Sequence, residues 1–352
     1  MNDMTDENAP GARHPDYIRA VFDRSIAMIE AGRLDSADVL LKTLSAEPSA
    51  VEAVAYLRGV IAARLGETVA AQLLFKTALE SNPHNADAHA QLGALLLEER
   101  PVSAAAAFAA ALALDARNAD WHCGFAEALR RLGFGDFARD SLDEALARAP
   151  GHQRAEQAAA LLEQEDAREF EALSPEDEAL LCDALFSEAT RRLGAGETVR
   201  AKAMYERVLK RAPSHLFSLC NLGALERALG HEEQSRSLLE QAVGLDPNFL
   251  PARLALAETH LAAGRAQEAR AQFLKAIALA PQDAAPHAAF AMALQKLGAP
   301  QEAIEHFHRA IMIDQNQPAE FYAALGAALE AMGMRDRAEV ALQHAAALAR
   351  PS

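Results

Sequence analysis

The chain has 352 residues, 51% of them hydrophobic, and its 50 Asp and Glu outnumber its 34 Lys and Arg, for a net charge of −16. Phosphate binding requires a basic face, so this acidity argues against nucleic acid and anionic membranes as partners. Three cysteines, no N-glycosylation sequon and the polar start MNDMTDENAP argue against a disulfide framework and a secretory leader. We therefore expect a reduced, cytoplasmic protein.

A self-similarity with a period close to 34 residues runs through the chain and is marked by prolines. From residue 213 onward the steps are 34, 34 and 34 residues, and earlier steps are 35, 33 and 34. One step of 63 residues equals a repeat with 29 inserted residues. The marking residues are Pro48, Pro83, Pro150, Pro213, Pro247 and Pro281. Ala116 and Gln315 stand at the two positions where the period predicts a proline and the sequence has another residue. Such a period is typical of a repeat array and not of a globular enzyme core.

The same residue types return at fixed positions of each unit. The eighth position is small: Ser25, Gly59, Gly93, Ala126, Gly223, Ala257, Ala291 and Gly326. The twentieth is small as well: Ala37, Ala71, Ala104, Ala138, Ala201, Ser235, Ala269, Ala303 and Ala338. Four places later stands a large apolar residue: Leu41, Phe75, Phe108, Leu142, Tyr205, Leu239, Phe273, Phe307 and Leu342. Because small residues let helices approach closely and a bulky one fills the adjacent gap, each unit is predicted to be a helical hairpin.

In chain order, residues 1–17 are predicted to form a disordered tail and residues 18–152 a first lobe of about four hairpins. Gly32, Gly66 and Gly133 fall where first helices of this lobe end, which predicts left-handed turns. The most apolar run of the chain, residues 104–114, is too short to span a bilayer. It indicates a buried second helix, and no membrane insertion is expected.

Residues 153–181 lack the repeat signature and are predicted to be an acidic helical linker or a degenerate repeat. Residues 153–180 hold nine acidic and two basic residues, and so carry −7 of the net −16. A single extra helix upsets the alternation of first and second helices, so we expect a kink or hinge near residues 163–174. The acidity is typical of a solvated linker face, and the alternative is a docking element for a basic partner.

Residues 182–352 are predicted to form a second lobe of about five hairpins. Its turn glycines are Gly230, Gly264, Gly298 and Gly333. Leu342, Ala346 and Leu348 form the end face of the last hairpin, which we expect to be partly bare. Such a face allows the protein to pair with a second copy in a homo-oligomer. The alternative is that the face stays exposed to solvent, because its apolar residues are mostly alanine.

Two short motifs recur within the repeats. An Ala-x-x-x-Phe step occurs at 71–75, 104–108, 269–273 and 303–307, and a Leu-Gly pair at 92–93, 222–223 and 325–326. These motifs resemble those of the tetratricopeptide repeat (TPR) family. The resemblance implies an all-α fold, a right-handed superhelical solenoid of helix-turn-helix repeats whose first helices line a concave groove. The chain departs from the family at an early Trp of the first helix, because its only tryptophan, Trp121, is one place off.

Catalytic signatures are weak throughout the sequence. Residues 133–138 match a dinucleotide fingerprint by spacing, but no strand precedes them. His306 and His308 lie two residues apart on a predicted helix and therefore point to different faces, which disfavours a shared metal. Cys123 and Cys220 share one repeat position and are interpreted as small packing residues. We expect no enzyme activity, no cofactor and no metal.

The residues late in the first helices are the main candidates for contacts in the groove. Seven are basic: Arg64, Arg130, Arg131, Arg191, Arg192, Arg227 and Lys296. Four acidic residues oppose them: Glu98, Glu127, Glu258 and Glu330. This excess predicts a groove suited to a partner with acidic groups, and the alternative is that the cations complement helix C-terminal dipoles.

Apolar anchors must also contribute, because exposed ion pairs provide only about 0.2 to 1 kcal/mol each. The candidates are Tyr56, Phe217, Leu254 and Met292. Asn221 precedes a Leu-Gly pair, as in the asparagine ladder of sugar-transferase arrays, but it stands alone here. The sequence thus predicts a non-catalytic scaffold or adaptor that binds a peptide segment or partner protein. The alternative is a regulatory or substrate-targeting arm of an enzyme, such as a glycosyltransferase or methyltransferase.

Overall fold

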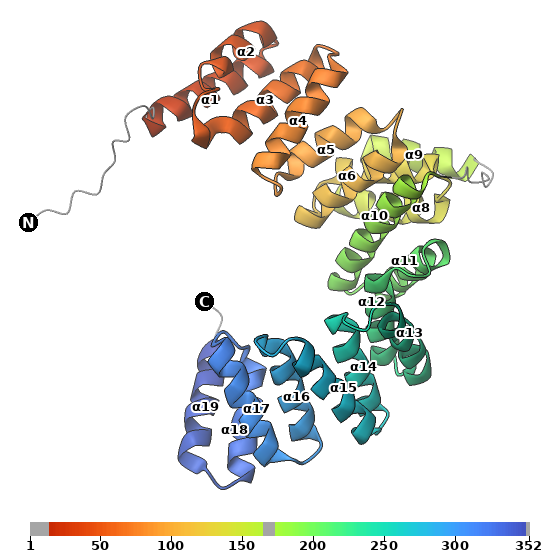
Figure 1. The fold of residues 1–352 in the computed structure, drawn as a ribbon. Helices are drawn as coiled ribbons and strands as arrows, with labels where there is room; N and C mark the ends of the chain where they lie inside the picture. Colours follow the sequence, from red (N-terminus) through yellow and green to blue (C-terminus); the bar gives the residue numbers. More distant parts are fainter. Residues whose placement is uncertain (1–13, 165–172, 350–352) are drawn as a thin grey trace, which may run out of the picture. The chain divides into compact units, whose positions relative to one another are not determined.

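The structure, a computed structural model, describes residues 14–164 and 173–349. This part of the chain forms 19 α-helices and one 3-10 helix, η1 (Pro48–Ala50), which confirms the all-α prediction (Figure 1). None of the described helices is both long enough and apolar enough to cross a membrane. Most of the predicted tail, residues 1–13, and the centre of the predicted hinge, residues 165–172, lie outside the described residues.

The helices group into two compact units, Met1–Gly196 and Glu197–Ser352. The hairpins of unit 1 are α1 (Pro15–Glu30) with α2 (Leu34–Lys42), α3 (Val51–Arg64) with α4 (Thr68–Ser81), α5 (Ala86–Leu96) with α6 (Pro101–Leu114), and α7 (Ala119–Arg131) with α8 (Gly135–Arg148). Two further helices of this unit are α9 (Gln153–Gln164) and α10 (Pro175–Gly194).

Unit 2 begins with the second helix α11 (Thr198–Arg211) and continues with four hairpins. These hairpins are α12 (Leu216–Ala228) with α13 (Glu232–Leu245), α14 (Leu250–Ala262) with α15 (Ala266–Leu279), α16 (Ala284–Lys296) with α17 (Pro300–Ile313), and α18 (Ala319–Ala331) with α19 (Arg335–Leu348). At the end of unit 2, Leu342 is 37% and Leu348 48% exposed, so these two residues of the end face are partly bare, as predicted.

The helix ends follow local sequence signals. All seven predicted turn glycines adopt the left-handed conformation, with φ between 70° and 82°: Gly32, Gly66, Gly133, Gly230, Gly264, Gly298 and Gly333. Each ends a first helix, where a residue with a Cβ is strained. Helix α1 begins at Pro15, within the stretch assigned to the tail, and the His14 side chain accepts a hydrogen bond from the Asp16 N–H.

The predicted pairing of small and large residues holds the hairpins together. A Cβ added to Gly59 would lie 2.7 Å from the Phe75 ring, and one added to Gly223 would lie 2.7 Å from Leu239. Real Cβ atoms do not approach that closely, so these glycines are needed for the two helices to meet. The packing prediction for the eighth position is therefore confirmed at these crossings.

Helix α6 differs from the other second helices because a further helix covers its outer side. Helix α10 packs along α6, and eight residues of α6 are buried. Ala109 is 2% exposed. The equivalent position is exposed in every other second helix: Lys42, Lys76, Asp143, Glu206, Glu240, Leu274, His308 and Gln343. The apolar run at 104–114 is thus a buried second helix, as predicted, and it is apolar on its outer side because α10 lies there.

Candidate functional site

A linked set of charged side chains lies on the first-helix side of unit 1. Arg131 of α7 donates to both carboxylate oxygens of Glu98, just after α5, at 2.7 and 2.9 Å, and to Glu127 at 2.7 Å. Arg130 donates two further bonds to Glu127, at 2.7 and 2.8 Å. Burial acts to raise the pKa of Glu127, but the hydrogen bonds from both arginines outweigh it and hold the pKa below its ordinary value.

Two more of the predicted cations connect successive first helices. Arg64 of α3 donates to the backbone carbonyl of Ile29 in α1 at 2.7 Å. Arg227 of α12 donates to Glu258 of α14 at 2.7 Å. Like Arg131, both join one repeat to its neighbour. These cations therefore already have partners within the array.

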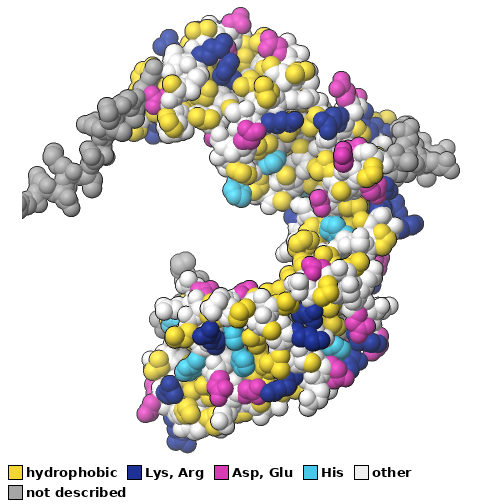
Figure 2. All heavy atoms as spheres, in the orientation of Figure 1, with side chains coloured by type: hydrophobic (Ala, Val, Ile, Leu, Met, Phe, Trp, Pro, Cys, Tyr) yellow, Lys and Arg dark blue, Asp and Glu magenta, His cyan; other side chains and the backbone are white. Residues whose placement is uncertain are grey.

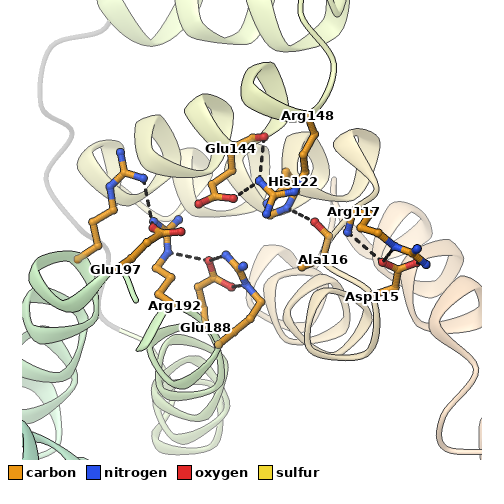
Figure 3. Close-up of polar contacts among 11 residues, drawn as sticks. Asp115, Ala116, Arg117, His122, Glu144, Arg148, Glu188, Arg192 and Glu197 are labelled. Carbon is orange, nitrogen blue, oxygen red and sulfur yellow. Dashed lines mark hydrogen bonds and ion pairs between the residues drawn. The ribbon is translucent and has the colours of Figure 1, made fainter. Parts of the chain in front are cut away.

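Arg191 and Arg192 lie in the last turn of α10, inside unit 1. Glu188 accepts two hydrogen bonds of 2.7 Å from Arg191 and one of 2.7 Å from Arg192. In Figure 3 the side chains of Glu188 and Arg192 face Glu144 and His122. The side chains of Glu188 and Arg192 are fully buried. Arg192 consequently has no surface from which to contact a partner.

Lys296 and Phe217 are more open. Lys296 ends α16, is exposed, and has no ion-pair partner among the described residues. Phe217, at the start of α12, is 54% exposed, and its ring meets that of Phe249, which precedes α14, edge-on at 5.1 Å. Asn221 donates a hydrogen bond of 3.2 Å to the Tyr205 hydroxyl of α11.

The remaining three candidates are partly buried and belong in part to the core. The ring of Tyr56 lies 5.9 Å from that of Phe75, and burial, together with the charges of Asp87 and Glu52, raises the pKa of Tyr56 to about 12. Leu254 and Met292 pack against the hydrophobic core of α14 to α19.

One cavity was missed by the sequence analysis. It has a volume of about 600 Å³ and lies between α17, α18 and α19 of unit 2. Its lining residues are His308, Ile311, Tyr322, Leu325, Leu329, Asp336, Arg337, Val340, Ala341 and His344. The sequence signal for it is Ala341, a small residue where the preceding second helices of unit 2 carry Met204, Leu238, Gln272 and His306.

Thiols and metal ligands offer little chemistry. Cys123, Cys182 and Cys220 are buried, and burial raises the pKa of Cys123 and of Cys220 to about 11, so these two thiols stay protonated at neutral pH. Across residues 14–164 and 173–349, no group of three or more His, Cys, Asp or Glu is placed to hold a metal ion.

A histidine pair links α16 to α17. Nδ1 of His287 lies 2.9 Å from Nδ1 of His306, and the His306 ring lies 4.8 Å from that of Phe290. Burial is the main reason why the pKa of each histidine lies below its ordinary 6.5. His306 lowers the pKa of His287 further, whereas Glu302 and Glu305 partly offset the shift at His306.

We expect the melting temperature of the protein to fall as the pH is lowered from about 7.5 to about 5.5. Below the ordinary histidine pKa the unfolded chain binds more protons than the folded one, so the free energy of unfolding decreases. Calorimetry of the wild type and of a His287→Gln, His306→Gln variant tests this. The melting temperature of the variant should depend less on pH than that of the wild type. An equal dependence in both proteins would contradict the lowered pKa of the two histidines.

Comparison with known proteins completes the description of the array. The tetratricopeptide repeat family model matches residues 226–297, which run from the end of α12 to α16. The hairpins, turn glycines and crossings of the chain follow the same pattern on both sides of that stretch. The chain is a tetratricopeptide repeat protein. TPR proteins bind protein partners and are usually non-catalytic.

Several solved structures are similar to this TPR protein. A TPR protein of Parabacteroides merdae is 18% identical, covers 76% of this chain and 94% of its own, and has a TM-score of 0.46. A TPR protein of Thermus thermophilus is 20% identical, with coverages of 48% and 91% and a TM-score of 0.44. MamA is 25% identical, with coverages of 45% and 91% and a TM-score of 0.38. No curated protein matches the chain.

Proposed function

We propose that this TPR protein is a non-catalytic scaffold that holds a peptide segment or partner surface along the first-helix side of its array. The main support is the exposed ring of Phe217 against Phe249, on helices whose other ends carry the Arg227–Glu258 pair. An apolar anchor and charged groups thus lie on the same pair of first helices. Figure 2 shows apolar and charged side chains interspersed over the array.

The energetics favour an apolar anchor assisted by charge. Micromolar binding requires about 8 kcal/mol, and each exposed ion pair provides about 0.2 to 1. Arg130, Arg131 and Arg227 are already paired, so a carboxylate of the partner must compete with Glu127, Glu98 or Glu258. Lys296 has no such competitor among the described residues, and it is the cation best placed to select a partner with acidic groups.

The proposal predicts that a Phe217→Ser, Lys296→Glu variant loses most of its partner. Tagged full-length protein would be used for affinity purification from its native cell extract at low and high salt, followed by mass spectrometry. We expect retention to fall by about tenfold, as for loss of an interface anchor. The matched control is Val199→Ser, because Val199 is 82% exposed on the second helix α11.

Equal retention by the wild type and the Phe217→Ser, Lys296→Glu variant would place the binding surface elsewhere. An enzyme retained at every salt concentration by both proteins would instead favour the regulatory-arm alternative. Melting curves of all three proteins show whether the substitutions leave the fold intact, as expected for exposed positions.

A further inference from the structure

The cavity of unit 2 lies on the opposite side of the hairpins from the proposed groove, and its walls are second helices. Helices α17 and α19 form the walls and α18 forms the floor, through Tyr322, Leu325 and Leu329. We call this site the α17–α19 groove. Its floor and much of its walls are apolar, and Figure 2 shows histidine side chains among apolar ones over this end of unit 2.

One residue in the wall of the groove is small. Ala341 of α19 occupies the position that His306 holds in α17, Gln272 in α15 and Leu238 in α13. Each of these larger side chains occupies the corresponding space in its own hairpin. His306 contacts His287 and Phe290, Gln272 accepts a bond of 3.1 Å from Arg253, and Leu238 packs against its local core.

Unit 1 has the same arrangement of helices at the same repeat positions, and a further helix lies over it. Its walls are α6 and α8, its floor is α7, and Ser141 stands where Ala341 stands in unit 2. The residues equivalent to the floor of the α17–α19 groove are His122, Phe125 and Leu129, which are fully buried. Their covering is α10, which packs along α6 and whose Glu188 and Arg191 act electrostatically on His122.

The polar contacts of the two floors correspond as well. The His122 ring is 2.9 Å from the Ala116 carbonyl, and the Tyr322 hydroxyl donates to the Gln315 carbonyl at 2.7 Å. Ala116 and Gln315 are the two sites where the array lacks its turn proline. His89 and Arg253 make the same contact with the carbonyls of Pro83 and Pro247, so this feature of the repeat is one that both floors share.

Helix α10 shows what kind of segment such a groove accepts. The stripe that it buries consists mainly of small and aliphatic residues: Leu181, Cys182, Ala184, Leu185, Glu188, Ala189 and Arg192. Its first turn is acidic, with Glu176, Asp177 and Glu178. It is an amphipathic helix with an acidic first turn, and its buried stripe also holds the Glu188–Arg192 ion pair.

One cation of the α17–α19 groove favours such a helix. Arg337 lines the groove together with one carboxylate, Asp336, and the imidazoles of His308 and His344. Arg337 has no ion-pair partner in the described part of the chain, and its nearest polar contact is the Met334 sulfur at 4.0 Å. A free guanidinium at the rim of an apolar groove favours an occupant with carboxylates next to its apolar stripe.

We propose that the α17–α19 groove is a second docking site, which binds an acidic amphipathic helix of a partner protein in the way that α10 covers the equivalent positions of unit 1. This site is independent of the first-helix surface, so the array can hold two ligands at once.

A labelled peptide of residues 175–194, the sequence of α10, serves as the probe and is titrated with the full-length protein by fluorescence anisotropy. We expect saturable binding, and we expect Ala341→His, which restores the side chain found in the preceding gap, to weaken it by about tenfold or more. Arg337→Glu should also weaken it, most strongly at low salt. Val199→Ser, on α11, should change it by less than about twofold.

Three results would overturn the proposal. One is the absence of saturation up to about 1 mM, the weak limit for a specific site. Another is equal affinity of the wild type and Ala341→His, which would mean that the peptide binds elsewhere, for instance by displacing α10. The third is self-association of the protein that Ala341→His abolishes, since the occupant would then be a second copy. Arg337→Glu keeps the test valid if Ala341→His melts early.

Discussion

Replacing Glu188 by alanine is expected to lower the free energy of unfolding of unit 1 by about 3 to 5 kcal/mol, as for breaking a buried ion pair. The Glu188 side chain is fully buried and binds both Arg191 and Arg192, of which Arg192 is itself fully buried. Alanine removes the carboxylate that these two guanidinium groups share. Urea denaturation followed by the fluorescence of Trp121, the only tryptophan, measures the loss in unit 1.

Two variants complete the Glu188 experiment. Glu188→Gln keeps the shape of the side chain and one acceptor oxygen. The free energy of unfolding of this variant should therefore lie between those of the wild type and of Glu188→Ala. Lys42→Ala removes the partly exposed partner of Asp38 in the same unit and should cost less than about 1 kcal/mol. If Glu188→Ala and Lys42→Ala proved equally mild, the buried ion pairs of Glu188 within α10 would not stabilise unit 1.

The repeat pattern predicted most of the fold because its signals are local. Turn glycines such as Gly66 and crossings such as Gly59 with Phe75 involve residues within one hairpin, where helical spacing fixes what meets. The position of α10 depends on a different kind of contact, between helices some seventy residues apart. Its trace in the sequence is Ala109, at a position where the other second helices carry polar or charged residues, with the exception of Leu274 in α15. A comparison of outer positions between repeats would have found it.

The candidate site was predicted less completely, for a related reason. Helical spacing placed Arg131, Arg227 and Lys296 late in their first helices, but it does not give the offset between one helix and the next. That offset decides that Arg131 reaches Glu98 and Arg227 reaches Glu258, while Lys296 stays unpaired among the described residues. Counting basic and acidic residues therefore overstated the free positive charge of the groove.

The largest packing effect is expected for Gly124→Ala in α7, at about 1 to 3 kcal/mol of lost stability, as for an overpacked core. A Cβ at Gly124 would lie 2.3 Å from the tip of the Phe108 ring, and the same ring already faces Gly93 at 3.0 Å. Phe108 is 3% exposed and is therefore enclosed between two glycines. Alanine normally favours a helix over glycine by about 1 kcal/mol, so a net loss of stability would come from this contact.

A double-mutant cycle separates the clash from other effects of the Gly124 substitution. Phe108→Leu shortens the side chain that the new methyl group meets, so the double variant should be more stable than the two single losses predict, by about 0.5 to 3 kcal/mol. Gly244→Ala in α13 is the matched control, because nothing lies within 4 Å of its added Cβ, and it should melt at or above the wild-type temperature. Additive losses at Gly124 and Phe108 would mean that α7 shifts away from α6 to admit the methyl group, and that the close crossing is not required for the fold of unit 1.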